Sequence, residues 1–220
     1  MPEFRKYTEY KAYSPDEMLR RSHNFYQDLQ LRRTVREFSN KPVPDEVIEN
    51  CIKSAGTAPS GANLQPWTFV AVKNSETKKA IRKKAEIEEK TFYNHRAPEE
   101  WLQAVEPFAT DEHKPFLETA PWLIAIFIQK YSNAKLGKKM HYYAPESVGI
   151  ATGMLIAALH HSGVVSLTHT PSPMNFLTNI LKRSKNERPF LLLPVGYASK
   201  NALVPDIERK TQSQITEFYE

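Results

Sequence analysis

The segments that most constrain the fold of this chain are apolar on nearly every side. Residues 121–128 and 190–197 are almost uninterrupted apolar runs, which is typical of buried strands. Between them, residues 147–160 follow a helical pattern with apolar residues all round, so this helix lies centrally or in a subunit interface. Because strands alternate with helices along the chain, we expect an α/β or α+β domain with helices on both sides of a sheet.

The remaining elements follow from hydrophobic periodicity and from breaks at proline and glycine. Helices are expected at residues 15–31, 45–55, 76–95 and 174–182, strands at 67–72 and 163–168, and a polar loop at 131–139. Residues 97–118 are the least regular region, and an irregular stretch of that length in a compact domain is typical of a lid. We therefore predict a lid at about 90–116 and, because residues 206–220 are too polar for a core, a C-terminal extension over a neighbour.

Composition limits the classes of protein. With 220 residues and 40% hydrophobic content, one domain spanning 1–220 is expected rather than two. The net charge of +5 does not predict a nucleic-acid partner, because the 25 acidic residues are interspersed among the 30 basic ones. Cys51 is the only cysteine, which excludes an intramolecular disulfide, and we expect it to be a small buried hydrophobe. No apolar run of membrane-spanning length occurs, so a soluble cytoplasmic protein is expected.

A small polar turn at residues 59–66 leads directly into the strand that begins at Trp67. Ser60 supplies a hydroxyl, Gly61 allows close approach of the backbone to a ligand, and residues 61–63 can turn backbone N–H groups outward as an anion-binding nest. Three arginines precede this turn, at positions 32, 33 and 36, and the guanidinium fork suits phosphate. Arginines at a helix end also complement the helix dipole, so both interpretations stay open on this evidence alone.

Several common catalytic motifs are missing from the sequence. The seven glycines do not spell a dinucleotide-binding fingerprint or a Walker loop, and there is no Gly-x-Ser-x-Gly elbow. No His-Glu-x-x-His occurs, and the adjacent His160 and His161 point in different directions from a helix, so no metal site is expected. Catalysis, if present, requires a cofactor.

Three segments together resemble the FMN-dependent nitroreductase superfamily: residues 32–36, 58–67 and 193–197. Residues 119–121, 141–143, 168–171 and 204–206, with Glu89, Tyr93 and Lys114, resemble the iodotyrosine deiodinases within it. The resemblance runs from about residue 15 to the end of the chain. It implies a nitroreductase-like three-layer α+β fold with a central mixed sheet flanked by helices, and a domain-swapped homodimer. The membrane anchor of the animal enzymes is missing, which fits a soluble, bacterial homologue.

The resemblance also implies a set of FMN-binding residues. Arginines would hold the phosphate and the pyrimidine end of the flavin with a threonine nearby, Ser60 would come from the partner subunit, and a late arginine would reach the phosphate. The segment 168–170 would lie beside the isoalloxazine, with the Thr170 hydroxyl donating to flavin N5 and tuning the flavin, the one catalytic role assigned. The full set is Arg32, Arg33, Thr34, Arg36, Ser60, Thr168, His169, Thr170 and Arg209.

A second set of residues is implied for a halotyrosine substrate. Glu89 and Tyr93 are four apart on one helix face, so an acceptor for an ammonium and a donor to a carboxylate can converge there. Lys114 would arrive from the lid to complete the carboxylate pairing, and the Ala62 backbone N–H would hold the phenolate oxygen. The implied reaction is reductive loss of halide from a 3-halotyrosine, with electrons from reduced FMN and ultimately from NADPH or a reductase.

Two alternatives to the dehalogenase remain: a general NAD(P)H-dependent nitroreductase or flavin reductase, and a non-catalytic FMN-binding protein. By spacing alone, Glu89 and Lys114 are ordinary solvated charges in charge-rich stretches, and only the resemblance favours a binding role for them. Residues 171–175 also carry extra positions relative to the Thr-Pro-Leu-Asn that is usual in the family.

Overall fold

The computed structural model describes residues 3–134 and 137–219, and the chain divides into two compact units, with the boundary between Arg32 and Arg33. Residues 1, 2, 135, 136 and 220 lie outside the described part. These residues include both ends of the predicted domain, part of the predicted loop 131–139 and the last residue of the predicted extension. The first unit contains helix α1 (Pro15–Gln30), which begins as the sequence predicts: the Ser14 hydroxyl accepts from the backbone N–H of Glu17, and Pro15 occupies the first turn. Within this unit, no residue of α1 is buried, and Met18, Leu19 and Phe25 lie exposed.

The second unit is built on a four-stranded sheet in the order β1 (Trp67–Val72), β2 (Trp122–Gln129), β6 (Glu187–Gly196) and β5 (Val165–Ser166). All three pairings of these strands are antiparallel. The expected sheet was mixed, and among the described residues its parallel component is limited to an isolated bridge between Thr34 and Ser166.

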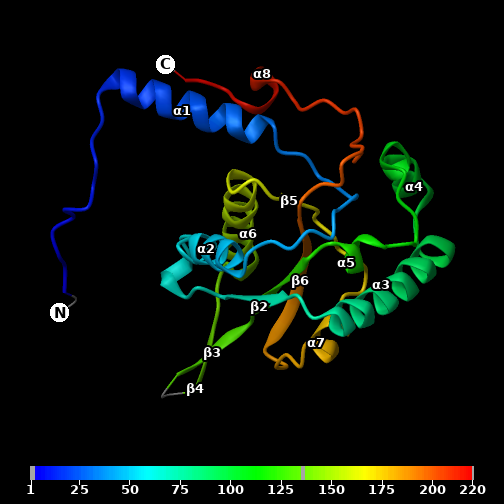
Figure 1. The fold of residues 1–220 in the computed structure, drawn as a ribbon. Helices are drawn as coiled ribbons and strands as arrows, with labels where there is room; N and C mark the ends of the chain where they lie inside the picture. Colours follow the sequence, from blue (N-terminus) through cyan, green and yellow to red (C-terminus); the bar gives the residue numbers. More distant parts are fainter. Residues whose placement is uncertain (1–2, 135–136, 220) are drawn as a thin grey trace. The chain divides into compact units, whose positions relative to one another are not determined.

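Helices cover both faces of the sheet, which gives the expected three layers (Figure 1). Side chains alternate along β2: the even-numbered positions pack with α2 (Asp45–Gly56) and α6 (Ala144–His161), and the odd-numbered ones with α3 (Ser75–His95), α5 (Phe116–Thr119) and α7 (Phe176–Ile180). A strand buried on both faces needs an apolar residue at every position, which explains the uninterrupted run seen in the sequence.

The structure corrects four of the predicted segments. The predicted polar loop at 131–139 contains the antiparallel strands β3 (Tyr131–Ala134) and β4 (Gly137–Met140), which pair through backbone groups. The irregular region 97–118 contains helix α4 (Glu99–Val105) and the short 3-10 helix η2 (Glu106–Phe108) before α5 begins. The predicted strand 163–168 is limited to the two residues of β5, and the polar extension carries a short helix, α8 (Gln212–Ile215).

Two further observations bear on the predictions. Cys51 is buried in α2 as expected, with its Sγ 3.5 Å from the Ser162 hydroxyl. In the described residues no helix combines the length and the apolar composition that crossing a bilayer would need.

Candidate active site

The three residues expected to bind the substrate lie together. Glu89 and Tyr93 project from one face of α3, and Lys114 comes from the loop that precedes α5. The Lys114 Nζ is 3.4 Å from Glu89 Oε2 and donates to the Thr110 hydroxyl at 3.2 Å, while the Tyr93 hydroxyl donates to the Thr110 carbonyl at 3.2 Å. Glu89 and Lys114 are both buried, at 8% and 3% exposure. A charged pair removed from water in this way is uncommon without a specific role.

Burial controls the electrostatics of this group of side chains. It raises the pKa of Glu89, although the neighbouring Lys114 ammonium opposes the shift. Burial also raises the pKa of Tyr93, so this phenol keeps its proton at neutral pH, and burial lowers the pKa of Arg36, which Tyr93 faces. The group therefore offers a carboxyl acceptor, an ammonium and a phenolic hydroxyl within one small region. Such a set can bind a ligand that carries both an amine and a carboxylate.

Aromatic rings enclose this group on the side of the lid. Trp101 of α4 packs edge-on against Phe92, with ring centroids 4.9 Å apart, and lies 5.5 Å from the Tyr93 ring. The Arg36 guanidinium lies 5.8 Å from the centroid of Phe108. The sequence analysis did not identify Trp101 or Thr110 as part of the site. The available signal for Trp101 was a large aromatic residue in an otherwise charged segment, inside the predicted lid.

His169 is the most perturbed titratable residue near this group. Its backbone pairs with Leu192 of β6, its ring lies edge-on to Phe116 at 5.4 Å, and its Nε2 is buried with no hydrogen-bond partner among the described residues. Burial first, and the charges of Lys114 and Arg36 second, lower the pKa of His169 to about 3. The adjacent Thr168 and Thr170 are exposed, as alternation along an extended segment requires.

The arginine-rich segment is only partly brought to this region. Arg36 faces Tyr93, as described above, and the Arg33 guanidinium donates to the Pro205 carbonyl. Thr34 forms the bridge to Ser166 at the edge of the sheet. Arg32 belongs to the first unit, and Arg209 lies exposed in the polar extension.

The polar turn before β1 makes hydrogen bonds within itself and with α6. The Ser60 hydroxyl accepts from the backbone N–H of Gln65 at 2.9 Å, and the Gly61 N–H is 3.4 Å from the Ser147 hydroxyl near the start of α6. A Cβ on Gly61 would lie 3.2 Å from the Tyr142 carbonyl, so the close approach of this backbone favours glycine. Ala62 has a left-handed backbone (φ 50°), which is uncommon outside glycine and is often found in functional turns.

In the described residues no cluster of three or more histidine, cysteine, aspartate or glutamate side chains has the arrangement of a metal site.

Comparison with known proteins identifies the family. The model of the nitroreductase family matches residues 29–197. The chain is 54% identical over 208 residues to the iodotyrosine deiodinase of Haliscomenobacter hydrossis, which covers 94% of both sequences. It is 48% identical over 205 residues to iodotyrosine deiodinase 1 of Homo sapiens, covering 92% of this chain and 71% of the human sequence.

A solved structure agrees with this assignment. The crystal structure of oxidised iodotyrosine deiodinase bound to FMN and 3-iodo-L-tyrosine is similar with a TM-score of 0.75 and 31% identity, over 89% of this chain and 99% of that one. The chain therefore belongs to the nitroreductase family and, within it, to the iodotyrosine deiodinases. The family resemblance and the three-layer α+β fold predicted from the sequence are confirmed.

Proposed function

We propose that this protein is an FMN-dependent oxidoreductase that removes halide reductively from 3-halotyrosines and releases tyrosine. The observation that carries the proposal is the meeting of Glu89, Tyr93 and Lys114 across the lid. The relatives named iodotyrosine deiodinase support the reaction, and the similar crystal structure with FMN and 3-iodo-L-tyrosine supports the cofactor and the substrate class.

The residues of this chain fit FMN. The buried Nε2 of His169 has no protein partner in the described residues, and the hydroxyls of Thr168 and Thr170 beside it are open to a ligand. Guanidinium groups suit the phosphate, which a neutral pocket would not hold. The remaining residues of the proposed FMN site have the roles that the family resemblance implies, toward the phosphate and the pyrimidine end of the flavin. They are Arg32, Arg33, Thr34, Arg36, Ser60 and Arg209.

The charged pair of the lid is complementary to an amino acid zwitterion. The substrate ammonium would pair with Glu89, and its carboxylate would pair with Lys114 and accept from the Tyr93 hydroxyl. Glu89 then exchanges the Lys114 ammonium for the substrate ammonium, and Lys114 exchanges the Glu89 carboxylate for the substrate carboxylate. No charge is therefore left unpaired inside the closed lid. The Ala62 N–H would bind the phenolate oxygen at the other end of the substrate.

In the proposed reaction the carbon–halogen bond breaks, the halide leaves, and the ring carbon gains a hydrogen. Two electrons and one proton are consumed, and FMN, reduced by NADPH or by a reductase, supplies the electrons. The side chains of this protein would bind and orient the substrate and exclude water when the lid (about 90–116) closes, and with FMN bound the Thr170 hydroxyl would donate to flavin N5.

We further propose a domain-swapped homodimer, acting in the cytoplasm. Two observations support a second subunit: the apolar side chains of α1, including Met18, Leu19 and Phe25, are exposed in the single chain, and large exposed apolar patches mark interaction surfaces. In the turn that carries Ser60 and Ala62, the Gly61 N–H lies 3.4 Å from the Ser147 hydroxyl of α6, which covers the face of the sheet opposite to α3, and this agrees with a role toward the partner's site. Sedimentation equilibrium tests the proposal: a dimer is expected, and a monomer at micromolar concentration would overturn it.

Titration of the FMN-loaded protein with 3-iodotyrosine tests the main proposal, with flavin fluorescence as the readout. We expect strong quenching for the native protein and for the control K90A, because Lys90 is an exposed neighbour on α3. K114M and E89Q should weaken this binding at least tenfold, since each removes a charge-assisted contact of about 1.5–3 kcal/mol. Both variants should still reduce a nitroaromatic compound. Equal losses on both substrates, or no quenching of the native protein at millimolar ligand, would refute the dehalogenase.

A further inference from the structure

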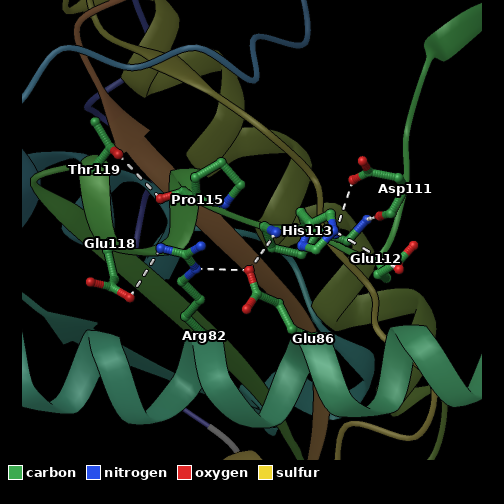
Figure 2. A network of polar contacts seen from close by, with 9 residues as sticks. Arg82, Glu86, Asp111, Glu112, His113, Pro115, Glu118 and Thr119 are labelled. Atoms are coloured by element: carbon green, nitrogen blue, oxygen red, sulfur yellow. Dashed lines mark hydrogen bonds and ion pairs between the residues drawn. The ribbon is translucent and has the colours of Figure 1, made fainter.

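Lys114 is attached to helix α3 by its backbone as well as by its side chain. The backbone N–H of Lys114 donates to Glu86 Oε1 at 2.8 Å, and Glu86 lies three residues before Glu89 on the same face of α3. The same carboxylate accepts from the Arg82 Nε at 2.7 Å, and the Arg82 Nη1 lies 3.3 Å from Glu118 of α5. Figure 2 shows this network joining the helix to the segment that carries Lys114.

We propose that Glu86 is a positioning residue for substrate binding: it fixes the backbone of Lys114 so that the ammonium reaches the site of the substrate carboxylate. The inference rests on the function proposed above. It adds a residue that makes no contact with the substrate and acts through Lys114 alone.

The backbone of Lys114 is held on both sides of its side chain. Its N–H is bound to Glu86, and its carbonyl accepts from the Leu117 N–H at 3.1 Å in the first turn of α5. Just before it, the His113 N–H donates to the Asp111 carboxylate at 2.9 Å, which shapes the loop. With the main chain fixed, the ammonium can change partners only through the torsions of the lysine side chain, which Glu89, Thr110 and the Asp111 carbonyl hold in this structure. A flexible lysine loses much entropy when ordered, so fixing its backbone in advance reduces the cost of binding.

Glu86 has the charge that this task requires. Burial favours its neutral form, but hydrogen bonds from Arg82 and from the Lys114 N–H outweigh it and lower the pKa of Glu86. The ionised carboxylate is a stronger acceptor than a neutral one. The two glutamates of α3 contact different parts of Lys114: Glu86 accepts from its backbone N–H, and Glu89 faces its ammonium.

The simpler interpretation is that Glu86 and Arg82 form an ordinary salt bridge one helical turn apart. Such pairs contribute about 0.3–0.5 kcal/mol, and the side chains of Arg82 and Glu86 keep 30% and 25% of their surface accessible. A purely structural pair would affect folding and every substrate alike. A positioning residue would affect only ligands that carry a carboxylate.

The test compares two ligands that differ in that group. FMN-loaded native protein, E86A and E86Q are titrated with 3-iodotyrosine and with 3-iodotyramine, which lacks the carboxylate. We expect E86A to bind 3-iodotyrosine about tenfold more weakly, as for loss of a hydrogen bond to a charged group, with 3-iodotyramine changed less than twofold. E86Q keeps an acceptor oxygen and should recover most of the affinity. E76Q removes a carboxylate from an exposed position of the same helix and is the matched control.

Coupling between the two positions provides the second test. In the K114M background, E86A should not weaken 3-iodotyrosine binding further, because the group that Glu86 positions is already gone. Additive losses, or equal losses for the two ligands, would refute the positioning role. If E86A does not fold, E86M replaces it, because methionine fills similar space without an acceptor oxygen: loss of selectivity for the carboxylate in this variant supports the proposal, and an unchanged preference refutes it.

Hydrogen exchange separates this inference from the proposed function. The Lys114 amide should exchange at least tenfold faster in E86A than in the native protein and in E76Q. Failure of the native protein to bind 3-iodotyrosine would overturn the function while faster exchange still showed the anchor. Unchanged exchange, with 3-iodotyrosine binding intact in the native protein, would overturn the anchor alone.

Discussion

His169 makes the stability of this protein sensitive to mildly acidic pH. Its side chain is buried, and its pKa is lowered from 6.5 to about 3, chiefly by burial and then by the nearby charges of Lys114 and Arg36. In the unfolded chain the imidazole binds a proton below pH ~6.5, whereas in the folded protein it stays neutral. The unfolded state therefore binds more protons, and the free energy of unfolding falls as the pH falls from about 6.5 toward 3.

The size of this loss follows from the shift. Each pH unit below the unfolded pKa costs about 1.4 kcal/mol, so lowering the pH from about 7.5 to about 5.0 should remove ~2 kcal/mol of stability. The carboxylates of Glu86 and Glu187, whose pKa values are lowered from 4.5, lose their contributions only at more acidic pH. Glu89 acts in the opposite direction because its pKa is raised: its protonation on acidification favours the folded state. The quantity to measure is therefore the difference between the native protein and a variant without His169.

The assay is urea unfolding of FMN-saturated protein, followed by tryptophan fluorescence at pH values between 5.0 and 7.5. H169Q cannot acquire the charge, so its stability should fall by ~2 kcal/mol less than that of the native protein over this range. H23Q, which changes an exposed histidine of α1, should behave as the native protein does. Parallel pH profiles for the native protein and H169Q would refute the argument that burial holds His169 neutral.

Two further predictions concern packing. G196A should lower stability by about 1–3 kcal/mol in thermal or urea unfolding, because a Cβ at Gly196 would lie 2.5 Å from the rigid ring of Pro121, whereas G56A has open space and should cost less than 1 kcal/mol. K78M should cost about 1–3 kcal/mol, since the buried Lys78 ammonium donates at 2.9 and 2.7 Å to two backbone carbonyls at the end of α5, and K79M at an exposed position should have little effect. Equal effects within either pair would contradict the reasoning.

The sequence was most informative where burial forces the choice of residue. The run 121–128 is apolar throughout because β2 is covered on both faces, and no other arrangement of a strand requires this. The β3–β4 hairpin was missed for the complementary reason. Its strands pair through backbone groups, so the sequence pattern of residues 131–139 resembles that of a loop.

In the candidate site, too, some residues could be related to one another from the sequence and others could not. Glu89 and Tyr93 share a helix face by spacing, but only the family resemblance connected them with Lys114, which lies 25 residues after Glu89 in the chain. The segment between them contains the end of α3, then α4 and η2 joined by short irregular connections, so sequence periodicity does not place its end. Trp101 was missed because the irregular region before it gave no register for α4.

The residue spacing on α3 also relates Glu86 to the candidate site. Glu86, Glu89 and Tyr93 lie at positions i, i+3 and i+7, so the rule that joined the last two also places Glu86 on their face. By spacing alone, an acidic residue four positions after an arginine is adequately explained as a surface salt bridge. That explanation accounts for the side chain of Arg82 but not for the backbone N–H of Lys114, which needs an acceptor once the lid is packed against the helix. A lid that brings a charged residue to a site must also satisfy the main chain beside that residue, and the helix face that receives the charge is the nearest source of an acceptor.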